Sequence, residues 1–200
     1  DRLGMLIMQD AVSGGRNRAG TLRTAVAMFL GIHSEDRSAS AHIQAGRGEK
    51  QNREEFEAHL RGMVKHLKNH PSIIMWVPFN ESWGQFDSRR ICGELRKNNP
   101  DRLIDSVSGW YDQGSGDFRS RHTYIIPLFK PPRRDPRPYF ISEYGGYNLS
   151  VKDHMWTETE RFGYRFYKDP ESLKEAYTRL IRKELIPLIR KGLRAAVYTQ

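Results

Sequence analysis

Short apolar runs alternate along the chain with segments whose apolar residues recur every three or four positions. The run GMLIMQD ends on the polar pair Gln9 and Asp10, and the run SIIMWVPF stops abruptly on Asn80 and Glu81. Runs of this length are typical of strands buried on both faces of a parallel sheet. Further runs of the same kind predict strands at 101–110, around 122–126, at 139–143 and at 193–200.

Three segments between these runs carry the apolar stripe of an amphipathic helix. Residues 52–70 form the first, with Asn52 and Glu55 spaced as a helix cap, and residues 88–98 form the second. The third begins after Asp169, kinks at Pro187 and ends at Gly192. The stripe positions of the first and third helices are Phe56, Leu60, Met63, Val64 and Leu67, and Leu173, Tyr177, Leu180, Ile181 and Leu185.

Strands that alternate with helices predict an α/β fold built from parallel βαβ units. The pattern fits either a doubly wound sheet or a (β/α) barrel. Residues 11–51 are the exception, because they are rich in Gly, Ser and Arg and show little periodicity. This segment is expected to be an insert, either a flexible loop, which is favoured, or a lid over a pocket.

Polar and aromatic side chains collect where the predicted strands end. In both barrels and open α/β sheets, the active site is built at these carboxyl ends. Two glutamates, Glu81 and Glu143, each follow a short apolar run directly, where packing alone gives no reason for a carboxyl. A partly desolvated carboxyl can hold a proton near neutral pH, as a general acid requires. Two such carboxyls in one pocket, about 5 to 5.5 Å apart, define a retaining glycosidase.

Each glutamate taken singly also fits a structural role, at a helix N-terminus or in a surface ion pair. Together they carry a resemblance, because HPSIIMWVPFNESWG (70–84) and YFISEYGG (139–146) are similar to the two active-site signatures of the glycoside hydrolase family 2 catalytic domain. DRLGMLIMQD resembles the third barrel strand of that family, and RAAVYTQ resembles its eighth. The resemblance implies a (β/α)8 TIM barrel, here a partial barrel covering approximately strands 3 to 8.

The resemblance also implies a role for individual residues. Glu81 would be the acid and base, Glu143 the nucleophile, and Asn80 a contact of the sugar 2-hydroxyl. Further sugar contacts would come from residues at the strand ends, for which packing at the rim of the sheet is an equal alternative: Asp10, Trp83, Trp110, His122, Tyr124, Tyr144 and Tyr198. The expected function is hydrolysis of terminal β-glycosides, with β-galactosides first, and no metal or organic cofactor is needed.

The same resemblance predicts that residues 1–200 form one truncated catalytic barrel domain. The first two barrel strands and the β-sandwich domains that usually precede them are expected to be missing, so the activity of this chain is uncertain. A homo-oligomer could form through the full-length protein. The alternative is a carbohydrate-binding fragment without turnover.

Charge and cysteine content change this picture little. Lys and Arg exceed Asp and Glu by 33 to 24, a net charge of +9, which can favour nucleic acid. The basic residues are scattered, however, so we expect a carbohydrate partner and no nucleic acid.

Cys92 is the single cysteine, which excludes an intrachain disulfide, and no Cys/His set has the spacing of a zinc site. No apolar run is long enough for a membrane span, so no membrane partner is expected, and the compartment stays open.

Overall fold

The structure is a computed structural model that describes residues 1–16, 35–131, 134–155, 157 and 163–199. The chain divides into two compact units, Asp1–Ser120 and Arg121–Gln200. Residues 17–34, which include most of the first half of the predicted insert, lie outside the described residues. Among the described residues, no helix has the length and hydropathy to cross a membrane.

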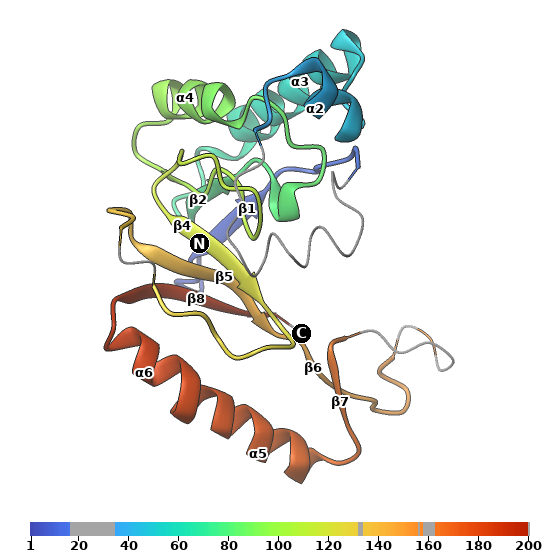
Figure 1. Cartoon of the computed structure of the whole chain (residues 1–200), viewed down its shortest axis with the longest axis vertical. Coiled ribbons are helices and arrows are strands. Elements are labelled where there is room, and N and C mark those ends of the chain that lie inside the picture. The colour runs from blue at the N-terminus through green and yellow to red at the C-terminus, as the bar shows by residue number, and fades with distance from the viewer. Residues whose placement is uncertain (17–34, 132–133, 156, 158–162, 200) are drawn as a thin grey trace. The chain divides into compact units, whose positions relative to one another are not determined.

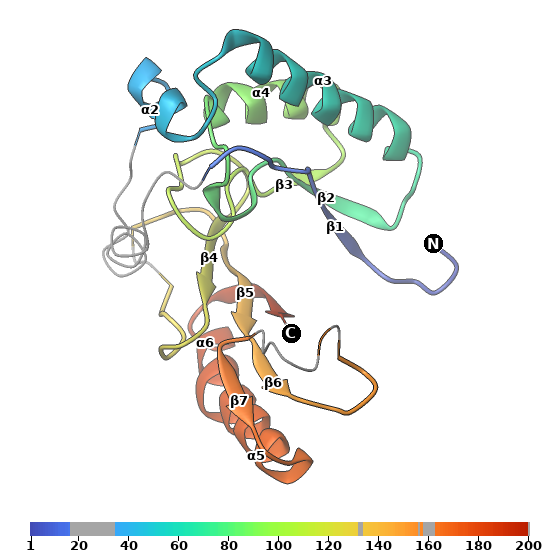
Figure 2. The same ribbon diagram turned by 90° about the vertical axis from the view of Figure 1, so that its right-hand side faces the viewer.

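The first unit is built on a parallel sheet with the strand order β1-β2-β3, of which Figure 1 labels β1 and β2 and Figure 2 labels all three strands. The strands are β1 (Ile7–Asp10), β2 (Ile73–Val77) and β3 (Leu103–Ile104). Asp10 pairs with Val77 in the parallel register, so both strands end at the same edge. The helices of this unit are α2 (Ala39–Gln44), α3 (Lys50–Leu67), the single 3-10 turn η1 (Asn80–Ser82) and α4 (Ser88–Asn98).

Helices α3 and α4 pack on one face of this sheet (Figure 2). The core joins Phe56, Leu60 and Val64 of α3 to Trp76 of β2 and Ile91 of α4. Met75 and Val77 of β2 are also buried, on the other face of the strand. Burial on both faces is what the uninterrupted apolar run predicted.

The start of α3 differs from the expected cap. The helix begins at Lys50, and its N-cap residue, Glu49, makes no capping hydrogen bond from its side chain. The amide oxygen of Asn52 instead accepts a hydrogen bond of 2.7 Å from Nη1 of Arg47. The capping prediction is therefore wrong, because the helix begins before Asn52 and the side chain of Asn52 binds Arg47, five residues earlier in the sequence.

The second unit contains the sheet order β4-β5-β8 and a separate pair, β6-β7. Strand β4 (Arg119–Thr123) begins at the unit boundary and lies earlier than the predicted 122–126. The other elements are β5 (Tyr139–Gly145), β6 (Tyr147–Leu149), β7 (Arg165–Tyr167), α5 (Pro170–Leu180), the π-helical turn η2 (Ile181–Leu185), α6 (Ile186–Ile189) and β8 (Leu193–Thr199). Strands β5 and β8 are parallel, and α5 and α6 pack against them.

The last helical segment begins as predicted. Oδ1 of Asp169 caps α5 by accepting a hydrogen bond of 2.7 Å from the backbone N–H of Ser172, and Pro170 occupies the first turn. The predicted kink at Pro187 is absorbed earlier, by the π-helical turn η2. Proline lacks an N–H and cannot complete a regular α-helical ladder, and a π-turn is one way to accommodate this gap.

Candidate active site

The turn that follows β2 carries Glu81 in an unusual backbone conformation. Glu81 and Ser82 have φ values of 51° and 62°, in the left-handed region. Residues other than glycine pay about 1–3 kcal/mol for such a conformation, which persists only where the surroundings enforce it. Strain of this kind concentrates at functional sites, and here it aims one specific carboxyl.

The segment after β3 holds this turn. Ser108 Oγ donates a hydrogen bond to Oδ1 of Asn80 and accepts one of 3.4 Å from the backbone N–H of Glu81. Ser82 Oγ donates to the carbonyl oxygen of Trp110 at 2.9 Å. Ser108 was not among the predicted site residues, because a serine in DSVSGW gives no signal of its own.

The structure brings part of the predicted sugar site together within the first unit. Asn80, Glu81 and Trp110 meet through the hydrogen bonds of this turn, and Trp110 is buried. Asp10 lies at the same carboxyl edge of the sheet, on the neighbouring strand β1. Trp83 is 42% exposed, so its indole is accessible for stacking on a sugar.

In the second unit, Glu143 lies on β5 within a chain of hydrogen bonds. Tyr124 Oη donates to Oε2 of Glu143 at 2.7 Å and lies 2.9 Å from Nδ1 of His122. A phenol has one hydrogen to donate, so Tyr124 accepts from His122, which places a proton on Nδ1. His122 is fully buried, and its Nε2 lies 3.9 Å from Oε1 of Glu143. This chain fixes the orientation of the carboxylate.

The ring of Tyr124 is itself held by a second tyrosine. Tyr164 stacks on it with the ring centroids 4.0 Å apart and the planes 9° apart. Tyr164 was not among the predicted site residues, because it lies just before a three-residue strand, β7, that is too short to show a pattern. The stacked pair therefore restrains the tyrosine ring whose hydroxyl binds Glu143.

Two other predicted site residues lie on the opposite face of the strands. Successive side chains along a strand point to opposite faces, so Tyr144 does not share the face of Glu143. The ring of Tyr144 instead packs edge to face on the ring of Tyr198, with the ring centroids 5.5 Å apart. Tyr198 also packs against Tyr177 of α5, and burial raises the pKa of both the Tyr144 and the Tyr198 phenols. Packing between the sheet and α5 is thus the better supported role for both tyrosines, and sugar contact stays a prediction.

Gly145 explains how β5 and β8 approach so closely beside these tyrosines. Its φ of 94° is unfavourable for other residues, and a Cβ atom there would overlap the ring of Tyr198.

As for metal ions, neither unit by itself gathers three His, Cys, Asp or Glu side chains at ligand distances, among the residues that the structure describes.

Comparisons with known proteins identify the family. The sequence profile described as "Glycosyl hydrolases family 2, TIM barrel domain" matches residues 1–188. A β-galactosidase of Klebsiella pneumoniae is 31% identical over 80 residues, which are 40% of this chain and 7% of the relative. Among solved structures, a β-D-glucuronidase of Dictyoglomus thermophilum aligns with 96% of this chain at a TM-score of 0.50 and 14% identity. A β-galacturonidase of Eisenbergiella tayi, solved with galacturonate, aligns equally well at 17% identity.

These matches cover only part of each relative, since the chain spans 37% of the length of both structures. The structural likeness supports a TIM-barrel-like α/β fold, in agreement with the parallel strands and helices described above. The profile match over nearly the whole sequence shows that the chain belongs to glycosyl hydrolase family 2.

Proposed function

We propose that the chain carries the catalytic residues of a retaining β-glycosidase that hydrolyses terminal β-glycosides. The observation that carries the proposal is the hydrogen-bonded row His122, Tyr124 and Glu143. It holds one carboxylate oxygen with a donor at 2.7 Å and turns the carboxylate toward a fixed direction, which a nucleophile needs. Family membership and the strained turn at Glu81 support the same reading.

In the proposed reaction, Glu81 protonates the glycosidic oxygen while an oxygen of Glu143 attacks the anomeric carbon. The bond to the leaving alcohol breaks, and a covalent glycosyl ester forms on Glu143. Glu81, now ionised, takes a proton from water, whose oxygen displaces Glu143 and releases the sugar. The proton that Glu81 takes from water replaces the one that it gave to the leaving alcohol, so Glu81 returns to its starting state.

Asn80 is proposed to bind the sugar beside the reacting carbon. Its Oδ1 already accepts a hydrogen bond from Ser108, so the orientation of the amide is set. The Nδ2 hydrogens are therefore the groups that we expect to donate to the 2-hydroxyl of the sugar. Hydrogen bonds to this hydroxyl strengthen in the transition state and contribute several kcal/mol.

A β-galactoside is the first substrate to test, because the curated relative with 31% identity is a β-galactosidase. The structural neighbours act on uronic acid glycosides according to their descriptions, so β-glucuronides and β-galacturonides belong in the same panel. The test is hydrolysis of nitrophenyl β-glycosides by the full-length protein, alone and with Glu81→Gln or Glu143→Gln. Glu94→Gln on α4 is the control for a neutralised surface carboxyl.

Both active-site variants are expected to lose at least about 100-fold in turnover, whereas Glu94→Gln keeps it. With an activated leaving group, azide should restore turnover in a Glu81→Ala variant as the β-glycosyl azide, because azide attacks the covalent intermediate in place of the activated water. In a Glu143→Ala variant no covalent intermediate can form, so any azide product should have the inverted, α configuration. The first product seen by NMR should retain the β configuration. Sugar binding without turnover in the unsubstituted protein, or an inverted product, would contradict the proposal.

A further inference from the structure

The turn that carries Glu81 is held from a part of the chain that the sequence pattern assigned to an insert. Phe79 and Phe86 bracket the turn, and both rings are fully buried against Phe56 of α3. The Phe56 and Phe79 rings stack at 5.2 Å, and the Phe56 and Phe86 rings meet edge to face at 5.6 Å. The two ends of the turn are thereby fixed, but the residues between them need further support.

Asp36 supplies this support on one side. Its side chain is buried, and Oδ2 accepts hydrogen bonds from Nε2 of Gln85 at 2.8 Å and from the backbone N–H of Ser88 at 3.1 Å. The Asp36 carbonyl accepts from the backbone N–H of Asp87 at 3.0 Å. Nε2 of Gln85 also donates to the carbonyl of Tyr111 at 3.1 Å, which connects Asp36 to the segment after β3.

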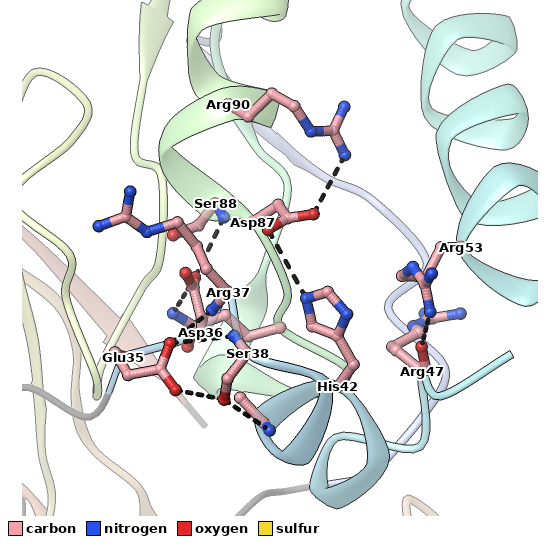
Figure 3. Close-up of polar contacts among 12 residues, drawn as sticks. Glu35, Asp36, Arg37, Ser38, His42, Arg47, Arg53, Asp87, Ser88 and Arg90 are labelled. Atoms are coloured by element: carbon pink, nitrogen blue, oxygen red, sulfur yellow. Dashed lines mark hydrogen bonds and ion pairs between the residues drawn. The ribbon is translucent and has the colours of Figure 1, made fainter. Parts of the chain in front are cut away.

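Asp36 is in turn held by its own neighbours, as Figure 3 shows. The carboxylate of Glu35 accepts from the backbone N–H groups of Arg37 at 2.8 Å and Ser38 at 3.1 Å. Ser38 then caps α2 through a bond of 3.2 Å from the N–H of Ala41. The backbone on both sides of Asp36 is thereby held, so the Asp36 carboxylate can act as a fixed acceptor for Gln85 and Ser88.

Asp87, at the end of the turn, is tied to two further elements in the same view (Figure 3). Its carboxylate lies 3.6 Å from Nε2 of His42 on α2 and 3.6 Å from Nη2 of Arg90 on α4. Asp87 has a φ of 42°, so the turn ends, as it begins, on a residue in the left-handed region.

Arg47 supplies the support on the other side. Its Nε donates to the carbonyl of Gly84 at 3.2 Å, and Nη2 donates to the carbonyl of Ser13. The guanidinium lies 4.7 Å from the centroid of the Phe56 ring. Gly84 has a φ of 61°, and a Cβ atom there would overlap the carbonyl oxygen of Gly14 and approach Nε of Arg47 within 2.9 Å.

We propose that Asp36 and Arg47 are positioning residues that hold the acid/base Glu81 in its reactive orientation, an inference that rests on the proposed function. Residues 81–87 contain three residues other than glycine in the left-handed region, namely Glu81, Ser82 and Asp87, together with Gly84, for which this conformation is unstrained. A turn under this much strain relaxes when its buried hydrogen bonds are removed. The expected consequence is a displaced proton donor in a protein that is still folded.

The first test compares Asp36→Ala with Asp36→Asn in the full-length protein. Both bonds to the side chain end on one oxygen, so the amide oxygen of asparagine can accept both, whereas alanine accepts neither. Hydrolysis is measured for β-glycosides of the preferred sugar whose leaving groups run from dinitrophenol, which leaves without a proton, to phenol and methanol. Thermal unfolding and circular dichroism report whether each variant folds.

Asp36→Ala is expected to lose about 10- to 100-fold in kcat/KM for the phenyl and methyl glycosides, because misplacing a catalytic group by about 1 Å costs this much. Its kcat/KM for the dinitrophenyl glycoside should change little. Asp36→Asn should have the same kcat/KM as the unsubstituted protein for every leaving group. The inference is overturned if kcat/KM of Asp36→Ala falls by the same factor for every leaving group, or if it depends on the leaving group as in the unsubstituted protein. Either result leaves the proposed function intact.

Arg47→Met is the second variant, and it decides the matter if Asp36→Ala does not fold. Methionine keeps the contact with Phe56 but removes the donor to Gly84. The same selective loss for poor leaving groups is expected, and its absence overturns the inference. If the unsubstituted protein hydrolyses none of the glycosides, the proposed function and this inference fail together, an outcome that is distinct from failure of the inference alone.

Discussion

The two candidate catalytic carboxyls are placed by different means at the level of single residues. Glu81 is aimed by its backbone, whose φ of 51° directs the side chain from a tight turn. Glu143 lies on β5, where the pairing with β8 shifts register between Ile141 and Tyr144, and its carboxylate is aimed by a side-chain hydrogen bond from Tyr124. Substitutions around Glu81 should therefore act through the shape of the turn, and substitutions around Glu143 through single polar groups.

Tyr124→Phe tests the second case most directly. It removes the hydrogen bond of 2.7 Å to Glu143 but keeps the ring that stacks on Tyr164. A hydrogen bond to a charged group contributes about 1.5–3 kcal/mol, so kcat/KM should fall about 10- to 100-fold. Steady-state kinetics on the preferred nitrophenyl glycoside measures this.

The control for this prediction is Tyr167→Phe. Tyr167 packs on Tyr147 in the second unit, and the variant should keep full activity. Equal losses in the two variants would show that the effect of Tyr124→Phe comes from general loosening of the second unit, and unchanged kinetics in Tyr124→Phe would show that Glu143 does not depend on this bond.

The sequence alone marks the two glutamates as candidates but not the residues that orient them. A carboxyl directly after an apolar strand contradicts the packing pattern, which is why Glu81 and Glu143 are conspicuous. Ser108, Tyr164 and Asp36 are ordinary residue types in loops, and each acquires its role through a partner at least 19 positions away in the sequence, as Tyr124 does with Glu143. No local pattern encodes such a contact.

At the level of elements, long periodic segments were predicted well and short ones poorly. Helix α4 spans residues 88–98 as predicted, because its apolar stripe is bounded by polar residues on both sides. Strands β6 and β7 have three residues each and were missed, since so short a run cannot show alternation. The π-helical turn η2 was missed because the sequence around Pro187 predicts a disruption but not how the backbone absorbs it.

The pairing of α3 with α4 gives a prediction at this scale. Glu57 on α3 receives hydrogen bonds of 2.6 Å and 3.2 Å from the two terminal nitrogens of Arg90 on α4. This bond to Arg90 is the main reason that the pKa of Glu57 is lowered. Because the Arg90 side chain is 44% exposed, solvent screens the pair, and Glu57→Gln should lower the free energy of unfolding by only about 0.5–1 kcal/mol at neutral pH.

The sign of the pH dependence follows from the lowered pKa. A carboxyl whose pKa is lower in the folded state stabilises fully above its unfolded value, about 4.3, and the contribution disappears as the pH falls through the folded value. Urea unfolding should therefore separate the variant from the unsubstituted protein at pH about 7 but not well below about 4. Glu54→Gln, in an exposed pair with Lys50, is the control and should change little. If the free energies of unfolding of Glu57→Gln and the unsubstituted protein still differ in acid, the effect comes from packing and not from the ion pair.

At the scale of the whole molecule, the candidate acid/base and the candidate nucleophile belong to different compact units. Each unit orients its own glutamate with its own residues, since the turn at Glu81 is bonded by Asp36, Arg47, Ser108 and Trp110 of the first unit, whereas Glu143 is held by His122 and Tyr124 of the second. This division explains why segments taken one at a time suffice to single out the two glutamates as candidates. Net charge is a property of the whole chain that bears on the choice between neutral and acidic substrates.

The net charge of +9 gives the last prediction, which concerns the choice between neutral and acidic sugars. A positive protein attracts a uronide anion over a distance that salt shortens, from about 10 Å at 0.1 M to about 3 Å at 1 M. The ratio of kcat/KM for a nitrophenyl β-glucuronide to that for the β-galactoside should therefore fall several-fold between these salt concentrations. The galactoside, which is neutral, serves as the internal control for salt effects on the protein itself. A ratio independent of salt would show that the surplus positive charge lies too far from the substrate to guide it, and that local contacts alone select the sugar.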